Sequence, residues 1–365
     1  MKSAGNLWIG FGIVAWSTTL SCYKPGTAAT DATPTVVDAP VIDAPIDALQ
    51  MPNLVFVSKQ VTSGNMGGLA GADATCNAEA AEARLLDTFR AVLWTAAEPV
   101  AMRFASSRGW VDLAGLPVAD RPSDFGPTML YPPSKLASGT PAPLFDLVAT
   151  GFSLTATTHA DCNGWTSSDN TLPMMVIRVN AIIDGNTGTS CGAPTRMLCA
   201  SIGRQRVISP PQATGRLAFI APRILLTGGI NQADAHCQST AAAAGLSARF
   251  RAMLAIGANS AAERFLQTDK PWRRVDGPIL AQSNADFFAL NWQIPLLRDA
   301  AGAVPSDFFD TSGAYLAVVG ASNDNCQNWT SSAIVGVTAI SPISNGNVGS
   351  GFVCGVAAPL VCLEN

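Results

Sequence analysis

Hydrophobic runs and polar breaks recur in the same order along two parts of this chain. Each part opens with a short apolar run before glycines, at 54–57 and at 217–220, which predicts a buried strand. An alanine-rich segment follows in each part, at 72–84 and at 233–244, and this composition predicts a helix. The repeated order predicts an α+β fold class in which one set of elements is built twice.

Further matches extend the pattern. Residues 89–91 and 250–252 both read Phe-Arg-Ala and lead into strand-like runs at 92–94 and 253–255. Acidic Asp73 and Asp234 are expected at the N-terminal ends of the two helices, where the helix dipole favours negative charge.

A second short helix is predicted in each part. It begins at Pro99 in the first part and at Ser260 in the second, where Glu263 completes a capping-box pattern. Arg103 and Arg264 match on this helix, and we expect both to be solvated. Beyond it, residues 110–112 match 274–276 before the two sequences diverge.

One octapeptide shows that the chain is a duplication. Residues 161–168 read Asp-Cys-Asn-Gly-Trp-Thr-Ser-Ser, and residues 325–332 read Asn-Cys-Gln-Asn-Trp-Thr-Ser-Ser. The shared tryptophans, Trp165 and Trp329, are expected in the core, with a ligand platform as the alternative. We refer below to residues 53–203 as the first copy and to residues 216–365 as the second copy.

The nine cysteines divide as one near the N-terminus and four in each copy. An even set at repeated spacing after a secretory signal is typical of a disulfide framework. Four-cysteine zinc sites are the alternative, but such sites usually contain close Cys-x-x-Cys pairs, and neither copy has one. We therefore expect no metal. The eight repeated positions are Cys76, Cys162, Cys191, Cys199, Cys237, Cys326, Cys354 and Cys362.

The first 52 residues predict export and a tether. Lys2 precedes an apolar run and small residues ending at Ser21, which is typical of a signal peptide at 1–21. Residues 19–22 resemble the lipobox of bacterial lipoproteins, which implies acylation of Cys22 and a lipid anchor in the membrane; ordinary secretion with cleavage nearby is the alternative. Residues 22–52 are rich in Ala, Asp and Pro and predict a disordered tether. Residues 204–215, with two prolines, predict a linker between two domains.

The cysteine order resembles that of C-type lectin-like domains, including their endostatin-like relatives. One cysteine lies in the first helix of each copy, and the last two stand eight residues apart before a closing apolar strand. The resemblance implies two tandem domains, 53–203 and 216–365, each with two short helices and small antiparallel sheets. It also implies nested disulfides, namely Cys76–Cys199, Cys162–Cys191, Cys237–Cys362 and Cys326–Cys354.

Sugar-binding members of that family hold calcium through Glu-Pro-Asn or Gln-Pro-Asp and Trp-Asn-Asp triplets. Neither copy has these triplets before its second and third cysteines. Calcium needs six to eight oxygen ligands, so calcium-dependent sugar binding is not expected. A calcium site elsewhere in the first copy, at Asp161 or Asp169, stays open.

Charge and chemistry narrow the class of function. The net charge is −4 with 13% charged residues, which gives no basic field for a nucleic acid. The two histidines, His159 and His236, have no equivalents in the opposite copy. The sequence has no phosphate-binding glycine loop, no Gly-x-Ser-x-Gly elbow and no His-Glu-x-x-His motif. We expect no enzyme and no cofactor.

The divergent tracts 117–159 and 280–323 are expected to carry recognition, because positions that serve the fold should recur in both copies. Aromatic loops on a braced scaffold make rigid contact surfaces. The alternative is that these aromatics pack a second small core. The candidate ligand-binding residues are Phe125, Tyr131, Phe145, Phe287, Phe288, Trp292, Phe308 and Tyr315.

Together these patterns predict a non-enzymatic binding or adhesion lipoprotein of the cell envelope. Tyr23, and not aspartate, follows Cys22, which favours the outer membrane. The expected partner is a surface glycan or protein. The alternatives are a structural envelope protein without a specific ligand and a hydrolase acting on surface polymers.

Overall fold

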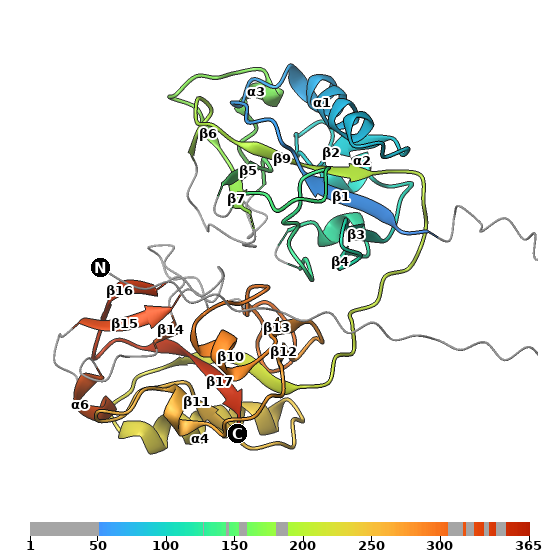
Figure 1. The fold of residues 1–365 in the computed structure, drawn as a ribbon. Helices are drawn as coiled ribbons and strands as arrows, with labels where there is room; N and C mark the ends of the chain where they lie inside the picture. Colours follow the sequence, from blue (N-terminus) through green and yellow to red (C-terminus); the bar gives the residue numbers. More distant parts are fainter. Residues whose placement is uncertain are drawn as a thin grey trace, which may run out of the picture. The chain divides into compact units, whose positions relative to one another are not determined.

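The chain is described here by a computed structural model. The structure describes residues 51–126, 128–143, 146–152, 159–179, 189–305, 317–318, 325–331, 336–340 and 348–365. These residues form a mixed α+β fold with few helices and several sheets (Figure 1). The α+β class predicted from the repeated pattern is confirmed. No helix among the described residues is long and apolar enough to cross a membrane.

Strands of the first copy form one sheet in the order β4-β3-β1-β9-β5-β7, and β2 also pairs with β9. The predicted apolar opening run lies in β1, which pairs antiparallel with β9 and parallel with β3. A two-stranded sheet joins β6 and β8. The strands are β1 (Asn53–Val57), β2 (Phe89–Ala91), β3 (Trp110–Asp112), β4 (Pro117–Ala119), β5 (Leu147–Ala149), β6 (Pro173–Met174), β7 (Val176–Arg178), β8 (Thr189–Ser190) and β9 (Arg196–Ser201).

Strands of the second copy repeat this order as β13-β12-β10-β17-β14-β15-β16, with β11 paired to β17. The central pair, β10 and β17, is again antiparallel. Equivalent strands therefore occupy equivalent places in the two sheets. They are β10 (Arg216–Ile224), β11 (Phe250–Ala252), β12 (Trp272–Arg274), β13 (Ile279–Ala281), β14 (Ala317–Val318), β15 (Gly336–Ile340), β16 (Val348–Val353) and β17 (Ala358–Glu364).

The alanine-rich segments form the two long helices, α1 (Gly68–Glu82) and α4 (Gly229–Ala243). Both begin four residues before the predicted start, at glycines with φ near +75° that let the chain turn sharply into the helix. The shorter helices are α2 (Val100–Arg103), η2 (Pro122–Asp124), α3 (Cys162–Trp165), η3 (Ala262–Arg264), α5 (Asn284–Phe288) and α6 (Cys326–Trp329).

Four disulfide bonds brace the two copies. They join Cys76 to Cys199 and Cys162 to Cys191, and Cys237 to Cys362 and Cys326 to Cys354. The prediction of disulfides is confirmed, and the pairs are those that the lectin-like resemblance implies. The longer bridges tie α1 to β9 and α4 to β17, so each long helix is fixed to the central strand of its sheet.

Arg103 and Arg264 are not solvated as predicted. Arg103 is 3% exposed, and its guanidinium donates to Asp73 at 2.6 Å. Arg264 donates in the same way to Asp234 at 2.6 Å, with its side chain 11% exposed. Both aspartates lie beyond the first helical turn, so the dipole explanation was wrong. Each carboxylate also accepts the main-chain N–H of the strand beside it, and thereby pins the helix to β2 or β11.

The match of 110–112 with 274–276 was also wrong, by two residues. Trp110 pairs with Asn53 in the sheet, and Trp272 pairs with Arg216 at the equivalent place. Trp272 is therefore the partner of Trp110. Both indoles are fully buried and both donate a hydrogen bond, to the carbonyl of Ser201 and to the amide oxygen of Asn284. The Val-Asp pairs at 111–112 and 275–276, which are identical in sequence but not equivalent in the sheets, set the wrong register.

The start of the expected linker packs against the first copy. Gln205 donates to the carbonyl of Ser106 at 2.6 Å, and the N–H of Ile208 donates to Asp120 at 2.7 Å. Arg204 forms an ion pair with Asp87. Residues 204–208 are thus tied to the surface of the first copy by side-chain contacts that the proline-rich composition did not indicate.

Candidate functional site

The described aromatic residues of the divergent tracts lie mostly inside the protein. Phe125, Tyr131, Phe287 and Trp292 are all at most 6% exposed, and Phe288 is partly buried. Phe125 packs on Trp110 with ring centroids 5.0 Å apart, and Phe287 packs on Trp272 at 4.8 Å. Burial raises the pKa of the Tyr131 hydroxyl. These side chains pack a core beneath the loops, which was the alternative interpretation.

The remaining candidate positions cannot be placed. Phe145, Phe308, Tyr315 and Cys22 lie outside the described residues. The expected roles of these four residues stay predictions.

The repeated octapeptide encodes a left-handed helical turn. Residues Cys162 to Trp165 have φ values of 51°, 57°, 65° and 67°, and Cys326 to Trp329 have 51°, 53°, 59° and 66°. Such a conformation costs about 1–2 kcal/mol for each L-residue other than glycine, so neighbouring groups must hold it in place.

Side chains at four positions of the octapeptide hold this turn in both copies. The cysteine is bridged, and Asp161 or Asn325 accepts the main-chain N–H three residues on. Trp165 and Trp329, at most 1% exposed, donate to the carbonyls of Trp94 and Ala255. The threonine hydroxyls donate to the carbonyl three residues back. The motif is therefore a structural lock, and its tryptophans lie in the core as expected.

Among the described residues, the partners of the two histidine rings are an aromatic ring and a main-chain carbonyl. His159 is exposed and stacks on Trp94, with ring centroids 3.8 Å apart and planes 8° apart. His236 bonds to the carbonyl of Pro222 at 2.9 Å. Neither contact resembles a nucleophile with its base.

The two aspartates considered for calcium are engaged elsewhere. Asp161 caps the left-handed turn, and Asp169 accepts both the N–H and the hydroxyl of Thr171 at 2.8 Å. The N–H of Thr171 holds the pKa of Asp169 below its usual value. Among the described residues no group of three or more His, Cys, Asp or Glu side chains is placed to hold a metal ion.

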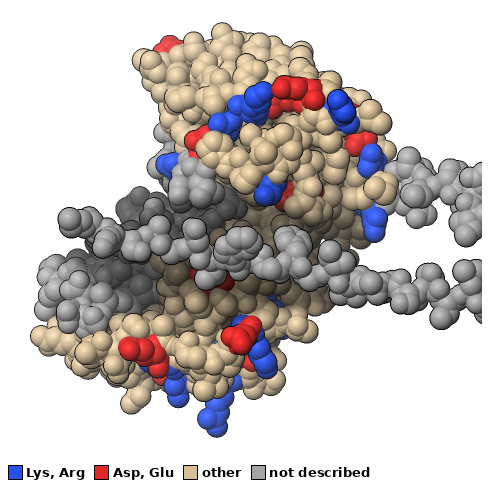
Figure 2. All heavy atoms as spheres, in the orientation of Figure 1, with Lys and Arg blue, Asp and Glu red and all other residues tan. Residues whose placement is uncertain are grey.

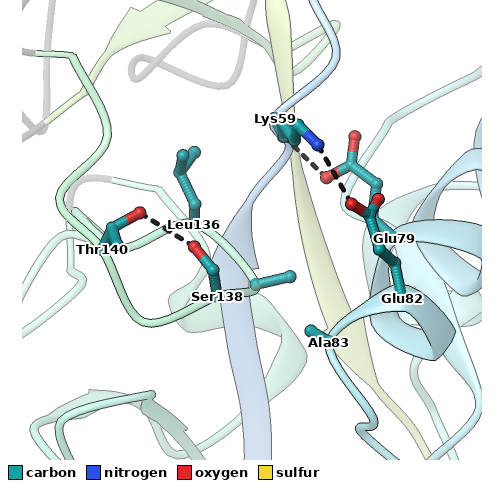
Figure 3. A pocket seen from close by; sticks show the side chains of 8 residues that line it. Lys59, Glu79, Glu82, Ala83, Leu136, Ser138 and Thr140 are labelled. Carbon is teal, nitrogen blue, oxygen red and sulfur yellow. Dashed lines mark hydrogen bonds and ion pairs between the residues drawn. The ribbon is translucent and has the colours of Figure 1, made fainter.

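A pocket of about 280 Å³ lies in the first copy, between the C-terminal half of α1 and the loop that follows Lys135 (Figure 3). Sequence reasoning missed this site because its walls come from segments far apart in the chain. Its lining residues are Lys59, Glu79, Glu82, Ala83, Leu136, Ala137, Ser138 and Thr140.

One wall of the pocket carries charge. Glu79 is 9% exposed, and its two carboxylate oxygens accept the main-chain N–H groups of Lys59 and Gln60 at 2.6 and 2.8 Å. The Lys59 ammonium instead pairs with Glu82 at 3.1 Å, and both side chains are well exposed, at 66% and 69%. Glu79 thus holds the end of β1 in place, while the exposed Lys59–Glu82 ion pair lies where a ligand can reach it.

The opposite wall carries hydroxyl groups. Ser138 and Thr140 are exposed, and their hydroxyls hydrogen-bond to each other at 2.8 Å. The tight loop that presents them is closed by the N–H of Leu136 donating to the carbonyl of Thr140 at 2.9 Å. Figure 3 shows the two glutamates on the helix and the two hydroxyls on the facing loop.

The second copy keeps the backbone of this loop but not its side chains. Asp299 donates its N–H to the carbonyl of Ala303 as Leu136 does to that of Thr140, and Gly302 donates to Asp299 as Gly139 does to Leu136. In order, Lys59, Glu79, Glu82, Leu136, Ser138 and Thr140 are matched by Pro222, Thr240, Ala243, Asp299, Ala301 and Ala303. The frame is shared, and the polar lining belongs to the first copy.

Surface charge elsewhere is mixed. On the face drawn in Figure 2, basic and acidic side chains are interspersed, and most of the described surface is neither. This face offers no continuous basic field to a polyanion.

Comparisons with known proteins identify no relative from which a function could be inferred. A scan against models of protein families finds no match to this chain, and a search of curated proteins finds no relative.

Proposed function

We propose that this chain is a non-enzymatic recognition lipoprotein of the bacterial cell envelope. It displays two tandem C-type lectin-like domains, 53–203 and 216–365, on a tether anchored through Cys22 in the outer membrane. The first domain binds a surface glycan through the pocket beside α1. The nested disulfides and the repeated sheet order support the lectin-like frame, which is a likeness of architecture and not of any family binding site.

One observation carries the assignment of binding to the first copy. The side chains that hold the frame recur in both copies, whereas the charged and hydroxyl side chains of the pocket occur in one. Ser138 and Thr140 are exposed on a loop whose backbone the second copy forms with alanines. In the second copy the Asp299 carboxylate holds this loop instead, by accepting the N–H groups of Ala301 and Ala303, whereas the exposed hydroxyls of the first copy are accessible to a ligand. Paired hydroxyls beside small apolar residues suit a sugar, which offers both hydroxyls and a C–H face.

A matched triple variant tests this proposal. Glu82→Ala, Ser138→Ala and Thr140→Ala introduce the residues that the second copy carries at these places, so the fold should tolerate them. Purified protein should bind glycans on an array saturably, and the triple variant should lose this binding. The control makes the reverse exchange, Ala243→Glu, Ala301→Ser and Ala303→Thr, and should bind as the unchanged protein does. Absence of saturable binding would instead favour a structural envelope protein, and turnover of a surface polymer would favour a hydrolase.

The anchor has a separate test. Cys22→Ser should move the protein from the membrane to the soluble fraction and remove labelling by a fatty-acid probe. An unchanged protein that is already soluble and unlabelled would leave secretion as the better explanation.

A further inference from the structure

The charges of the pocket indicate more than a general glycan site. Glu79 and Glu82 contribute two negative charges and Lys59 one positive charge, so the formal balance of the lining is −1. A carboxylate has about four lone-pair sites, and Glu79 uses one main-chain N–H at each oxygen. The wall formed by α1 therefore attracts a cation that can also donate hydrogen bonds.

The present contact of Glu82 shows which cation fits. The Lys59 ammonium lies 3.1 Å from the Glu82 carboxylate at the rim of the pocket. Since both groups are well exposed, the pair is worth no more than about 1 kcal/mol and is readily exchanged. Lys59 thus stands in for the ammonium group of a ligand.

We propose that the pocket selects a sugar unit that carries a free primary amine. The ammonium binds Glu82 in place of Lys59, with the negative charge of Glu79 behind it, and the ring hydroxyls bind Ser138 and Thr140. Leu136, Ala137 and Ala83 contact the apolar face of the ring. This inference rests on the proposed function and names its ligand class.

The size and the far wall of the pocket favour an amino sugar over a lysine side chain. At about 280 Å³ the pocket lies just below the usual range of ligand sites, about 300 to 1,000 Å³, so it takes one ring of a chain. A lysine side chain offers only methylene groups opposite Ser138 and Thr140. The hydroxyls of a sugar satisfy both.

Calorimetric titration of the full chain tests the inference with four probes. These are a glucosamine oligomer, its N-acetylated counterpart, a glucose oligomer and a lysine-rich peptide, at mildly acidic pH where amines are protonated and the glutamates are ionised. We expect the glucosamine oligomer to bind at least tenfold more tightly than the N-acetylated one. Glu82→Gln should remove most of this preference, and Lys59→Met should raise the affinity for the amine by up to about fivefold, because it frees Glu82.

The outcomes separate the two proposals. Equal binding of the amine and N-acetylated oligomers, abolished by the triple alanine variant, would overturn amine selection and leave glycan recognition standing. Tighter binding of the lysine-rich peptide than of any sugar would overturn the ligand class. Binding unaffected by the triple variant, or no binding of any probe, would overturn both. Thermal unfolding of Glu82→Gln and Lys59→Met checks that the exposed substitutions leave the fold intact, and Ala243→Glu in the second copy controls for added charge.

Discussion

The two copies share the contacts that brace their folds and differ in the side chains of the pocket beside the first helix. In both, a long disulfide fixes the first helix to the central strand, a buried Asp–Arg pair fixes it to the neighbouring strand, and a left-handed turn is locked by a tryptophan. The positions that recur have partners in the main chain or in a disulfide. The exposed side chains of the pocket do not recur, and even Glu79, which accepts two main-chain N–H groups, is replaced by Thr240 in the second copy.

The second copy also has a buried charge network at positions where the described part of the first copy carries other residues. Arg216 stacks on Trp272 at 3.7 Å, where the first copy has Asn53. Arg274 and Arg298 both pair with the carboxylate of Asp276. In the place of Arg274 the first copy has Asp112, whose carboxylate accepts the N–H of Leu116 in the turn that follows. Burial, with Arg274 nearby, lowers the pKa of Arg298 to about 10. The two copies therefore share a sheet architecture but place different polar side chains at equivalent positions of it.

The largest expected effect comes from removing a long disulfide bridge, and it tests whether both copies depend equally on this bridge for stability. Replacing both cysteines of a long bridge by alanine, Cys76 with Cys199 or Cys237 with Cys362, opens loops closed over 123 and 125 residues. Each double variant should lose about 5 kcal/mol in the chain-entropy estimate, and each short bridge about 3.5 kcal/mol. Urea unfolding of the full chain measures both losses. A bridge whose removal costs nothing would show that its copy does not depend on the shared bracing.

The Asp–Arg pairs should show the next largest effect. Arg103→Met leaves Asp73 in a site where burial already raises its pKa, so we expect a loss of about 3 kcal/mol. Arg264→Met should cost less, because that side chain is more exposed, at 11% against 2%. Urea midpoints of the two variants make the comparison. An equal or larger loss from Arg264→Met would reverse the ranking by burial.

Substitutions at the two locking tryptophans should have a smaller effect on stability. They separate the contribution of the indole donor from that of the side chain on the residue that supplies the acceptor carbonyl. Trp165→Phe and Trp329→Phe each leave a carbonyl without its indole donor, and each should cost about 2 kcal/mol. Trp94→Ala keeps the carbonyl but loses the stack on His159 and part of the packing of a half-buried indole against the core, for an expected total of about 1 kcal/mol. The second copy already has alanine there, at Ala255. Thermal unfolding should rank the three variants, and a Trp94→Ala loss as large as that of Trp165→Phe would contradict this division.

Sequence patterns predicted the features that repeat locally. Cysteine spacing, alanine-rich segments and apolar runs are properties of short stretches, so the helices, central strands and disulfides were open to prediction. Arg103 was misjudged because its burial comes from partners distant in the chain, the carboxylate of Asp73 on α1 and the carbonyl of Ala91 in β2. The shift at Trp110 arose because a dipeptide identity, Val-Asp in both copies, carries no information on strand register.

The pocket could not be predicted for a related reason. Its walls come from the end of β1, from α1 and from the loop after Lys135, and only tertiary packing brings Lys59, Glu82 and Ser138 together. Comparison of the two copies did point to divergent positions as candidates for recognition. It selected the aromatics of the divergent tracts, however, because it had no measure of burial, and the described aromatics fill the core.

The smallest expected effect is an acid-dependent difference between the copies. Burial raises the pKa of Asp120, but the hydrogen bond from Arg108 and the N–H of Ile208 outweigh it and lower the pKa below its usual value. A lowered carboxyl pKa gives stability that is present above the unfolded-state pKa and is lost as the pH falls through the folded-state pKa. Asp120→Asn should therefore destabilise the chain at neutral pH, by at most about 1 kcal/mol because the pair is partly exposed, and should cost nothing in strong acid.

The second copy supplies the control, because Gln282 stands where the first copy has Asp120. Gln282→Asn removes no charge, so its effect on stability should be the same at neutral and at acid pH. Urea unfolding at both pH values compares each variant with the unchanged chain, and the opposite pH dependence of Asp73 cancels in that difference. If the cost of Asp120→Asn stays constant down to strong acid, the tie between Asp120 and the segment at Ile208 does not depend on charge. Residues 204–208 would then be held to the first copy by their other contacts, from Arg204 to Asp87 and from Gln205 to Ser106.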